Sequence, residues 1–150
     1  MQKLTKSLLI RAAAKARSGA SAPYSNFKVG AAILTEAGEI VAGANVESAS
    51  YGLTCCAERV ALFTAISSRK GNFKAIAVVA RILAGPMPCG ACRQLLLEYA
   101  PEAVVLVADS DDLSQIRSFR VGDLLPDAFT QIPGSGFSIE KKAPNRRLLR

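Results

Sequence analysis

A chain of 150 residues, half of them hydrophobic and 21% charged, has the size and composition of one globular domain that buries a core without disulfide bonds. The absence of histidine excludes every catalytic device that uses an imidazole and every metal site with a histidine ligand, which leaves four cysteines as the soft metal ligands. The net charge of +7 is concentrated at the C-terminus, because residues 140–150 hold five cations and one acid, a net +4.

The charge distribution divides the chain into two parts. We expect a catalytic domain over residues 1–130 and a basic, flexible extension over residues 131–150. The alternative for the extension is a segment that binds phosphate or a partner. The domain itself carries about +3 without runs of like charge, so we expect neither a nucleic acid nor a membrane as partner.

The N-terminal sequence bears on the compartment. The apolar run at residues 8–10 is too short for the core of a secretory signal, and no stretch reaches the length of a membrane span. A cytoplasmic protein is therefore expected. In a reducing cytosol, four cysteines favour metal or redox chemistry over disulfide bonds.

The first predicted element is an amphipathic helix over residues 4–17. Its apolar face is predicted to contain Leu4, Leu8 and Ala12, with the basic residues largely elsewhere. The breakers that follow, up to Pro23, end it.

Two strands are expected next, at residues 28–34 and 39–46, joined by a hairpin turn at residues 36–38. The later predicted elements are a helix at 56–67, a strand at 75–80, a helix at 90–99 and strands at 103–108 and 116–121. This alternation predicts an α/β fold with helices on the faces of one sheet. The first strand pair should be antiparallel, and the strands linked through helices at least partly parallel.

Three cysteines fall at the beginnings of two predicted helices. Cys56 precedes one helix, and Cys89 and Cys92 flank the start of the other. A helix N-terminus stabilises a thiolate through its unpaired N–H groups and the positive end of the helix dipole. A Cys-x-x-Cys pair with a third thiolate can hold one tetrahedral zinc and leave the fourth position open, as in catalytic zinc sites.

Polar residues next to these cysteines suit a catalytic site. Glu58 lies two residues after Cys56, where its carboxylate can move protons between an attacking water and a substrate. Arg59 and Arg93 are placed so that either can reach back toward the sulfurs. Cationic hydrogen-bond donors there would offset the negative charge of three thiolates on one divalent ion.

Two other readings of the cysteines remain open. A Cys-x-x-Cys between a strand and a helix also fits a thioredoxin-like redox pair, although that leaves Cys56 and Glu58 unexplained. A closed structural zinc site would recruit Cys55 as a fourth ligand, which is awkward for adjacent residues. We expect Cys55 to be a small buried hydrophobic residue.

The motif Cys56-Ala57-Glu58 followed by Pro88-Cys89-x-x-Cys92 has the form of the zinc deaminase signature in its three-cysteine version. The flanking segments in the same order resemble the cytidine deaminase family and extend the likeness over residues 4–130: they are residues 22–32, 45–52, 88–94 and 124–129. The chain is most similar in pattern to the homotetrameric branch of that family, which uses three cysteines.

The resemblance implies a three-layer α/β/α fold with a central five-stranded mixed sheet. It also implies zinc-dependent hydrolytic deamination of cytidine and deoxycytidine to uridine and deoxyuridine, a reaction of pyrimidine salvage. One Zn²⁺ per subunit, a small-molecule pyrimidine nucleoside as substrate, and a homotetramer whose sites are completed by neighbouring subunits follow from the same likeness.

The resemblance also assigns residues to roles. It implies Cys56, Cys89 and Cys92 as zinc ligands and Glu58 as the proton carrier. The implied substrate contacts are Phe27 on the pyrimidine ring, Asn45 and Glu47 on the ribose hydroxyls, the backbone of Ala57 on the base carbonyl, and Tyr51 and Phe129 at or across subunit boundaries. Arg59 is implied as a hydrogen-bond donor to the thiolates.

The sequence departs from the family pattern at Cys55 and at Met87, where an apolar or amide residue and a small hydroxyl residue are expected. Three alternative functions remain open. The first is a related deaminase acting on another aminopyrimidine, such as a nucleoside antibiotic or a free base. The second is a polynucleotide-editing deaminase, and the third is a non-enzymatic zinc or redox module.

Overall fold

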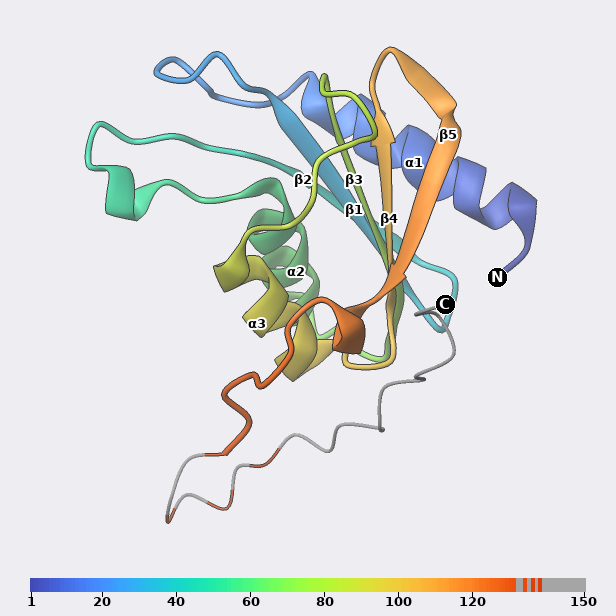
Figure 1. Ribbon diagram of the computed structural model, residues 1–150, viewed down its shortest axis with the longest axis vertical. Helices are drawn as coiled ribbons and strands as arrows, with labels where there is room; N and C mark the ends of the chain where they lie inside the picture. Colours follow the sequence, from blue (N-terminus) through green and yellow to red (C-terminus); the bar gives the residue numbers. More distant parts are fainter. Residues whose placement is uncertain (132–133, 135, 137, 139–150) are drawn as a thin grey trace.

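The computed structural model describes residues 1–131, 134, 136 and 138. A five-stranded sheet with the strand order β2-β1-β3-β4-β5 forms its centre (Figure 1). The strands are β1 (Val29–Thr35), β2 (Ile40–Ala44), β3 (Phe73–Ala80), β4 (Val104–Asp109) and β5 (Asp112–Arg120). The helices are α1 (Lys3–Arg17), α2 (Ala57–Ser67) and α3 (Gly90–Tyr99), with single 3-10 turns η1 (Tyr51–Leu53) and η2 (Val121–Asp123).

The sheet is mixed, as expected from the order of the elements. β1 pairs antiparallel with both β2 and β3, and β4 pairs antiparallel with β5. β3 and β4 are parallel, and the connection between them contains α3, which provides the crossover that a parallel pair requires. The predicted antiparallel first pair and the partly parallel later strands are confirmed.

The helices cover both faces of the sheet, so the predicted three-layer α/β/α architecture is confirmed: α1 lies on one face, and α2 and α3 lie on the other (Figure 1). Alternate residues of the central strands point to opposite faces, so that Ile76 and Val78 pack toward α2 and α3 while Ala77 and Val79 pack toward α1. α2 approaches the sheet closely at Gly43, where an added Cβ would lie 2.5 Å from the backbone nitrogen of Ala61.

The predicted apolar face of the first helix is wrong. α1 buries Leu9, Ile10 and Ala13, whereas Leu4 and Leu8 are 70% and 54% exposed. Apolar residues occupy three consecutive positions at 8–10, so their spacing is compatible with more than one buried face. The face of α1 that is buried is the one that lies close to β1 at Gly30. An added Cβ on Gly30 would lie 2.0 Å from the carbonyl oxygen of Ala13.

Other boundaries moved by a few residues. The helix expected at 56–67 begins at Ala57, with Cys56 as its N-cap, and the strand expected at 116–121 is the longer β5. Within the described residues, no helix is long and apolar enough to cross a membrane. The expectation of a flexible extension over 131–150 falls almost entirely outside the described residues.

Candidate active site

The three predicted zinc ligands come together at the beginnings of α2 and α3. Cys56 and Cys89 are the N-cap residues of the two helices, and Cys92 lies in the first turn of α3. Their Sγ atoms all lie within 4.8 Å of one another, and the Sγ atoms of Cys56 and Cys89 are 3.8 Å apart. Tetrahedral zinc with Zn–S bonds of about 2.3 Å places two sulfurs roughly 3.8 Å apart, so the thiol cluster fits this ion.

Hydrogen bonds join the three thiols to one another. Hydrogen bonding from the Cys92 thiol, and then from Cys89 and the Arg59 guanidinium, lowers the pKa of Cys56 to about 5 despite its partial burial. The same hydrogen bond to Cys56, together with burial, raises the pKa of Cys92. One sulfur of the cluster is therefore readily ionised, which suits a site that exchanges thiol protons for a divalent cation.

Glu58 is a buried acid beside this cluster. It lies in the first turn of α2 and is only 5% exposed. Burial raises the pKa of Glu58 to about 7, with a further contribution from the nearby Cys56 sulfur. A carboxyl group with this pKa both accepts and releases a proton near neutral pH, which is the property a proton carrier needs.

Arg59 lies against the thiol cluster, as the sequence indicated. Its Nη2 donates to the carbonyl oxygen of Thr54 at 2.5 Å, and its guanidinium also contacts Cys56. Among the residues that the structure describes, the buried Nε of Arg59 finds no hydrogen-bond partner. Although burial alone lowers it, the pKa of Arg59 is raised by the hydrogen bond to Cys56 and by the neighbouring sulfurs, so the cation is stabilised by the thiols.

Arg93 has a different role from the one considered for it. Its Nε donates to the carbonyl oxygen of Pro88 at 2.8 Å and its Nη1 donates to that of Leu124 at 3.1 Å. The Arg93 side chain therefore joins the segment before α3 to the segment at η2. Its guanidinium donates to backbone carbonyl groups in place of the sulfurs considered from the sequence. Met87, the other departure in this segment, is partly buried against the core on the α2 and α3 side of the sheet.

Cys55 does not join the thiol cluster of the described residues. Its backbone pairs with that of Val46, with N–O distances of 2.8 and 3.0 Å. Its side chain is half-buried, so the prediction of a small buried residue is only partly right. The closed four-cysteine site has no support in this arrangement.

Asn45 and Glu47, the predicted ribose ligands, both contact the loop that carries Phe27. The Oδ1 of Asn45 accepts from the backbone N–H of Val29 at 2.8 Å, and its Nδ2 donates to the carbonyl of Phe27 at 3.0 Å. Asn45 is 7% exposed, so these bonds are protected from water. Asn45 therefore has a structural role, holding the backbone of Phe27 and Val29, that the sequence did not reveal. Its contact with substrate stays a prediction.

Glu47 accepts from the backbone N–H groups of Tyr24 and Ser25 at 2.9 and 3.1 Å, and from the Ser25 hydroxyl. The Ser25 hydroxyl, ahead of two backbone donations, lowers the pKa of Glu47. Sequence reasoning missed Ser25. Its position two residues before Phe27 is typical of a serine that bonds its own backbone two residues on, and this is the signal that was available.

The predicted aromatic contacts are all accessible. Phe27 is 40% exposed, Phe129 62% and Tyr51 78%. Tyr51 packs edge-on against Tyr24, with ring centroids 6.4 Å apart. The carbonyl oxygen of Phe129 accepts a hydrogen bond of 2.7 Å from Gln94 of α3, which attaches the Phe129 backbone to the helix that carries Cys92.

A cavity of about 390 Å³ lies beside Glu47. Its lining residues are Tyr24, Ser25, Glu47, Ser48, Tyr51 and Thr54. Phe27, Phe129 and the thiol cluster are outside this lining. The structure of one chain therefore groups the predicted site residues in two sets, one around the thiols and one around Glu47.

Ala57 is the first residue of α2, and its side chain is fully buried. The backbone hydrogen bond from Val60 to the Cys56 carbonyl, 3.1 Å long, opens the helix. The Ala57 N–H therefore precedes the first helical hydrogen bond and has no acceptor within the helix. A backbone donor next to Cys56 suits a ligand carbonyl, as predicted for this position.

Comparisons with known proteins all identify the same family. Residues 3–108 match the family model of the cytidine and deoxycytidylate deaminase zinc-binding region. The cytidine deaminase of Halalkalibacterium halodurans is 48% identical over 127 residues, covering 85% of this chain and 96% of that protein. The cytidine deaminase of Mycobacterium tuberculosis is 44% identical over 117 residues, covering 78% and 84%.

Among solved structures, the crystal structure of cytidine deaminase from Burkholderia pseudomallei matches with a TM-score of 0.79 and 48% sequence identity. The match covers 86% of this chain and 100% of that chain. The thiol cluster and Glu58 both lie inside the segment that the family model matches.

Proposed function

The chain belongs to the cytidine and deoxycytidylate deaminase family and is a zinc-dependent enzyme, and from this premise we propose how its residues divide the work of the reaction. The reaction is the hydrolysis of cytidine and deoxycytidine to uridine and deoxyuridine. Water supplies the oxygen that bonds to C4 of the ring, and the amino group leaves as ammonia. The observation that carries this function is the cluster of three thiols beside the buried carboxyl group of Glu58.

Cys56, Cys89 and Cys92 hold one Zn²⁺ per subunit in this proposal, and the sulfur separation described above fits that ion. When bound, zinc supplies a Lewis-acidic open position that makes a water acidic enough to attack at neutral pH. Arg59 offsets the negative charge of the three thiolates through its contact with Cys56.

Glu58 carries the protons. It accepts a proton from the attacking water and delivers it to N3 of the pyrimidine, which makes C4 more electrophilic. Once the oxygen has bonded to C4, Glu58 accepts the remaining proton of that hydroxyl group and delivers it to the amino group at C4. The carbon–nitrogen bond then breaks, ammonia leaves and the C4 carbonyl of uridine forms. Burial that raises the pKa of Glu58 to about 7 supports both directions of transfer.

The substrate contacts use residues of both sets. Phe27 packs its ring on the pyrimidine, since an aromatic face suits a flat base. The Ala57 N–H donates to the base carbonyl. Glu47 accepts from the ribose hydroxyls, and Asn45 contributes the amide hydrogen that its bond to Phe27 leaves unused.

We place the enzyme in pyrimidine salvage in the cytoplasm and propose a homotetramer. The exposed rings of Tyr51 and Phe129 support the oligomer, because large aromatic side chains at these exposures are typical of surfaces that become covered. In the tetramer they complete a neighbouring subunit's site or line the boundary.

The test is incubation of the purified, zinc-loaded protein with cytidine, followed by the ultraviolet absorbance change and by ammonia release. We expect stoichiometric ammonia and uridine, and little turnover of free cytosine, because cytosine lacks the sugar that Glu47 holds. An excess of polynucleotide should leave the rate unchanged. No ammonia from cytidine or deoxycytidine would refute the proposed function, and faster turnover of cytosine would refute the ribose contacts.

A further inference from the structure

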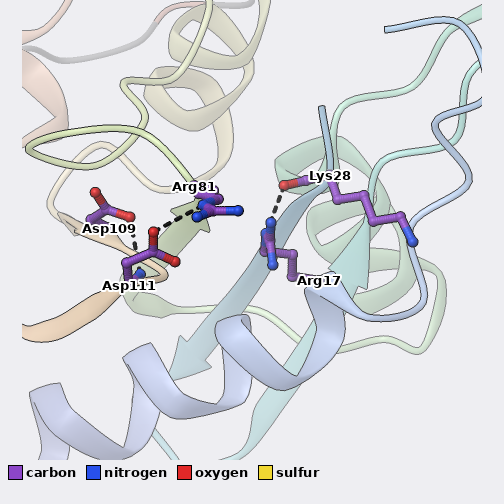
Figure 2. Close-up of polar contacts among 5 residues, drawn as sticks. All are labelled: Arg17, Lys28, Arg81, Asp109 and Asp111. Atoms are coloured by element: carbon purple, nitrogen blue, oxygen red, sulfur yellow. Dashed lines mark hydrogen bonds and ion pairs between the residues drawn. The ribbon is translucent and has the colours of Figure 1, made fainter. Parts of the chain in front are cut away.

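The loop that carries Phe27 is held in place by side chains from other parts of the chain. This Phe27 loop, residues 24–28, lies between α1 and β1 and belongs to no regular element. The Nε of Arg17, at the end of α1, donates to the carbonyl of Lys28 at 2.9 Å, and Figure 2 shows the Lys28 ammonium directed away from Arg17. Asn45 and Glu47 hold the rest of the loop through the hydrogen bonds described above.

Ser25 lies at the centre of these contacts. Its hydroxyl donates to Oε1 of Glu47, and its oxygen accepts from the backbone N–H of Phe27 at 3.0 Å. The direction of both bonds is settled, because an ionised carboxylate only accepts and a backbone N–H only donates. The Ser25 hydroxyl thus joins the Glu47 carboxylate, which is assigned to the sugar, to the backbone of Phe27, whose ring is assigned to the base.

The geometry leaves Glu47 a defined place for a ligand. A carboxylate has about four acceptor positions, and three are used by Tyr24 N–H, Ser25 N–H and the Ser25 hydroxyl. Ser25 and Glu47 both line the cavity of about 390 Å³. The Ser25 hydroxyl therefore determines which acceptor position of Glu47 stays open to a substrate hydroxyl.

We propose that Ser25 is a positioning residue that orients Glu47 for the ribose and fixes the backbone of Phe27 for the pyrimidine ring. This role rests on the proposed function, since it acts through Glu47 and Phe27 as substrate contacts. It also couples the two contacts: loss of the hydroxyl disturbs sugar and base binding together. The thiol cluster and Glu58 make none of these bonds, so the chemical step should be spared.

The experiment uses the full-length, zinc-loaded enzyme and the variants Ser25→Ala and Ser25→Thr. Ser25→Ala should raise KM for cytidine about tenfold and leave kcat within about twofold, because it removes a hydrogen bond to a charged group and a second bond to the Phe27 backbone. Ser25→Thr retains the hydroxyl and should keep KM within about threefold of the wild type. Zinc content and thermal unfolding are recorded for each variant.

A matched control is available in Ser114 on β5, at the opposite edge of the sheet from β2. Its hydroxyl donates to Oδ1 of Asp112 at 2.6 Å, so it makes the same kind of serine–carboxylate bond. That bond also lowers the pKa of Asp112. Ser114→Ala should leave both kcat and KM unchanged, which separates the loss of such a bond in general from the loss of this one.

A double-mutant cycle with Glu47→Gln tests whether Ser25 acts through Glu47. The KM increases of the two single variants should then combine to less than their product. Three results would each overturn the positioning role: a wild-type KM in Ser25→Ala, a rise in KM as large in Ser25→Thr as in Ser25→Ala, or KM increases that multiply strictly in the double variant. Turnover of cytidine by the wild-type enzyme would still uphold the proposed function in each of these cases. A wild-type enzyme that does not deaminate cytidine overturns the proposed function and this role with it.

Discussion

The thiol cluster and the Phe27 loop are positioned by different means. Cys56 and Cys89 are the N-cap residues of α2 and α3, two helices that pack on the same face of the sheet, so their places follow from regular backbone. The Phe27 loop belongs to no helix or strand. Arg17 and Asn45 hold it by donating hydrogen bonds to its carbonyl groups, and Glu47 holds it by accepting from its backbone N–H groups. The first arrangement is supported by the core, and the second by individual polar contacts.

This difference separates two kinds of effect. A change at the thiol cluster or Glu58 should remove zinc or the proton carrier and leave the nucleoside contacts intact, so it acts on kcat. A change in the hydrogen bonds around the Phe27 loop should weaken nucleoside binding with zinc still bound, so it acts on KM. The variants below test that separation.

The largest effect is expected from Glu58→Gln. The amide cannot carry the protons, so kcat for cytidine should fall by at least about a thousandfold. Zinc content should stay at the wild-type value, since Glu58 is outside the three-thiol set, and uridine should still bind. Steady-state kinetics and elemental analysis measure both. Near-normal turnover would remove Glu58 from the mechanism, and loss of zinc would make it a ligand.

Cys89→Ser tests the metal itself. Cys89 is exposed, so the substitution should not disturb the core, but a serine hydroxyl is a much poorer zinc ligand than a thiolate. We expect the zinc content after dialysis to fall at least about tenfold, with activity falling in parallel and partly restored by excess zinc. Circular dichroism serves as the control for folding. Full zinc occupancy with full activity would contradict the three-thiol site.

Asn45→Ala should affect stability and binding together. It leaves the Val29 N–H and the Phe27 carbonyl without partners, which costs about 1–3 kcal/mol in the free energy of unfolding. KM for cytidine should rise as the Phe27 loop loosens, with zinc content unchanged. Denaturant titration and kinetics give the two values, and Gln115→Ala, at an exposed position of β5, is the control. A stability loss with an unchanged KM would assign Asn45 to structure alone.

The contrast between positions set by regular backbone and positions set by individual contacts also explains which features could be predicted from the sequence. α3 was predicted at its observed bounds because a buried strand, a proline-containing break and a Cys-x-x-Cys mark its start. The thiols could be assigned for the same reason, since helix starts leave local signals. The buried face of α1 was predicted wrongly, because it depends on the approach of Ala13 to Gly30, a contact between elements that spacing does not encode.

The network around the Phe27 loop was beyond sequence reasoning for a related reason. Glu47 and Ser25 are 22 residues apart, and their contact exists only because the segment after β2 returns to the start of β1. Short polar residues such as Ser25 have many local roles in loops, so their type alone indicates a turn. The resemblance to a family named Asn45 and Glu47 as substrate contacts but did not reveal their bonds to the loop.

The smallest effect is expected from Cys55→Ala, and it tests whether position or residue type makes a zinc ligand. Cys55 is adjacent to Cys56, but its backbone pairs with Val46 and its thiol is outside the cluster. Zinc content should therefore stay at one ion per chain, and kcat/KM should stay within about twofold. The half-buried thiol contributes only a small packing term, so the free energy of unfolding should change by less than about 1 kcal/mol. If zinc were lost instead, Cys55 would be a fourth ligand and the site would have no open position for water. The thiol cluster could then not carry out the chemical step, and the contrast between the thiol cluster and the Phe27 loop would have to be abandoned.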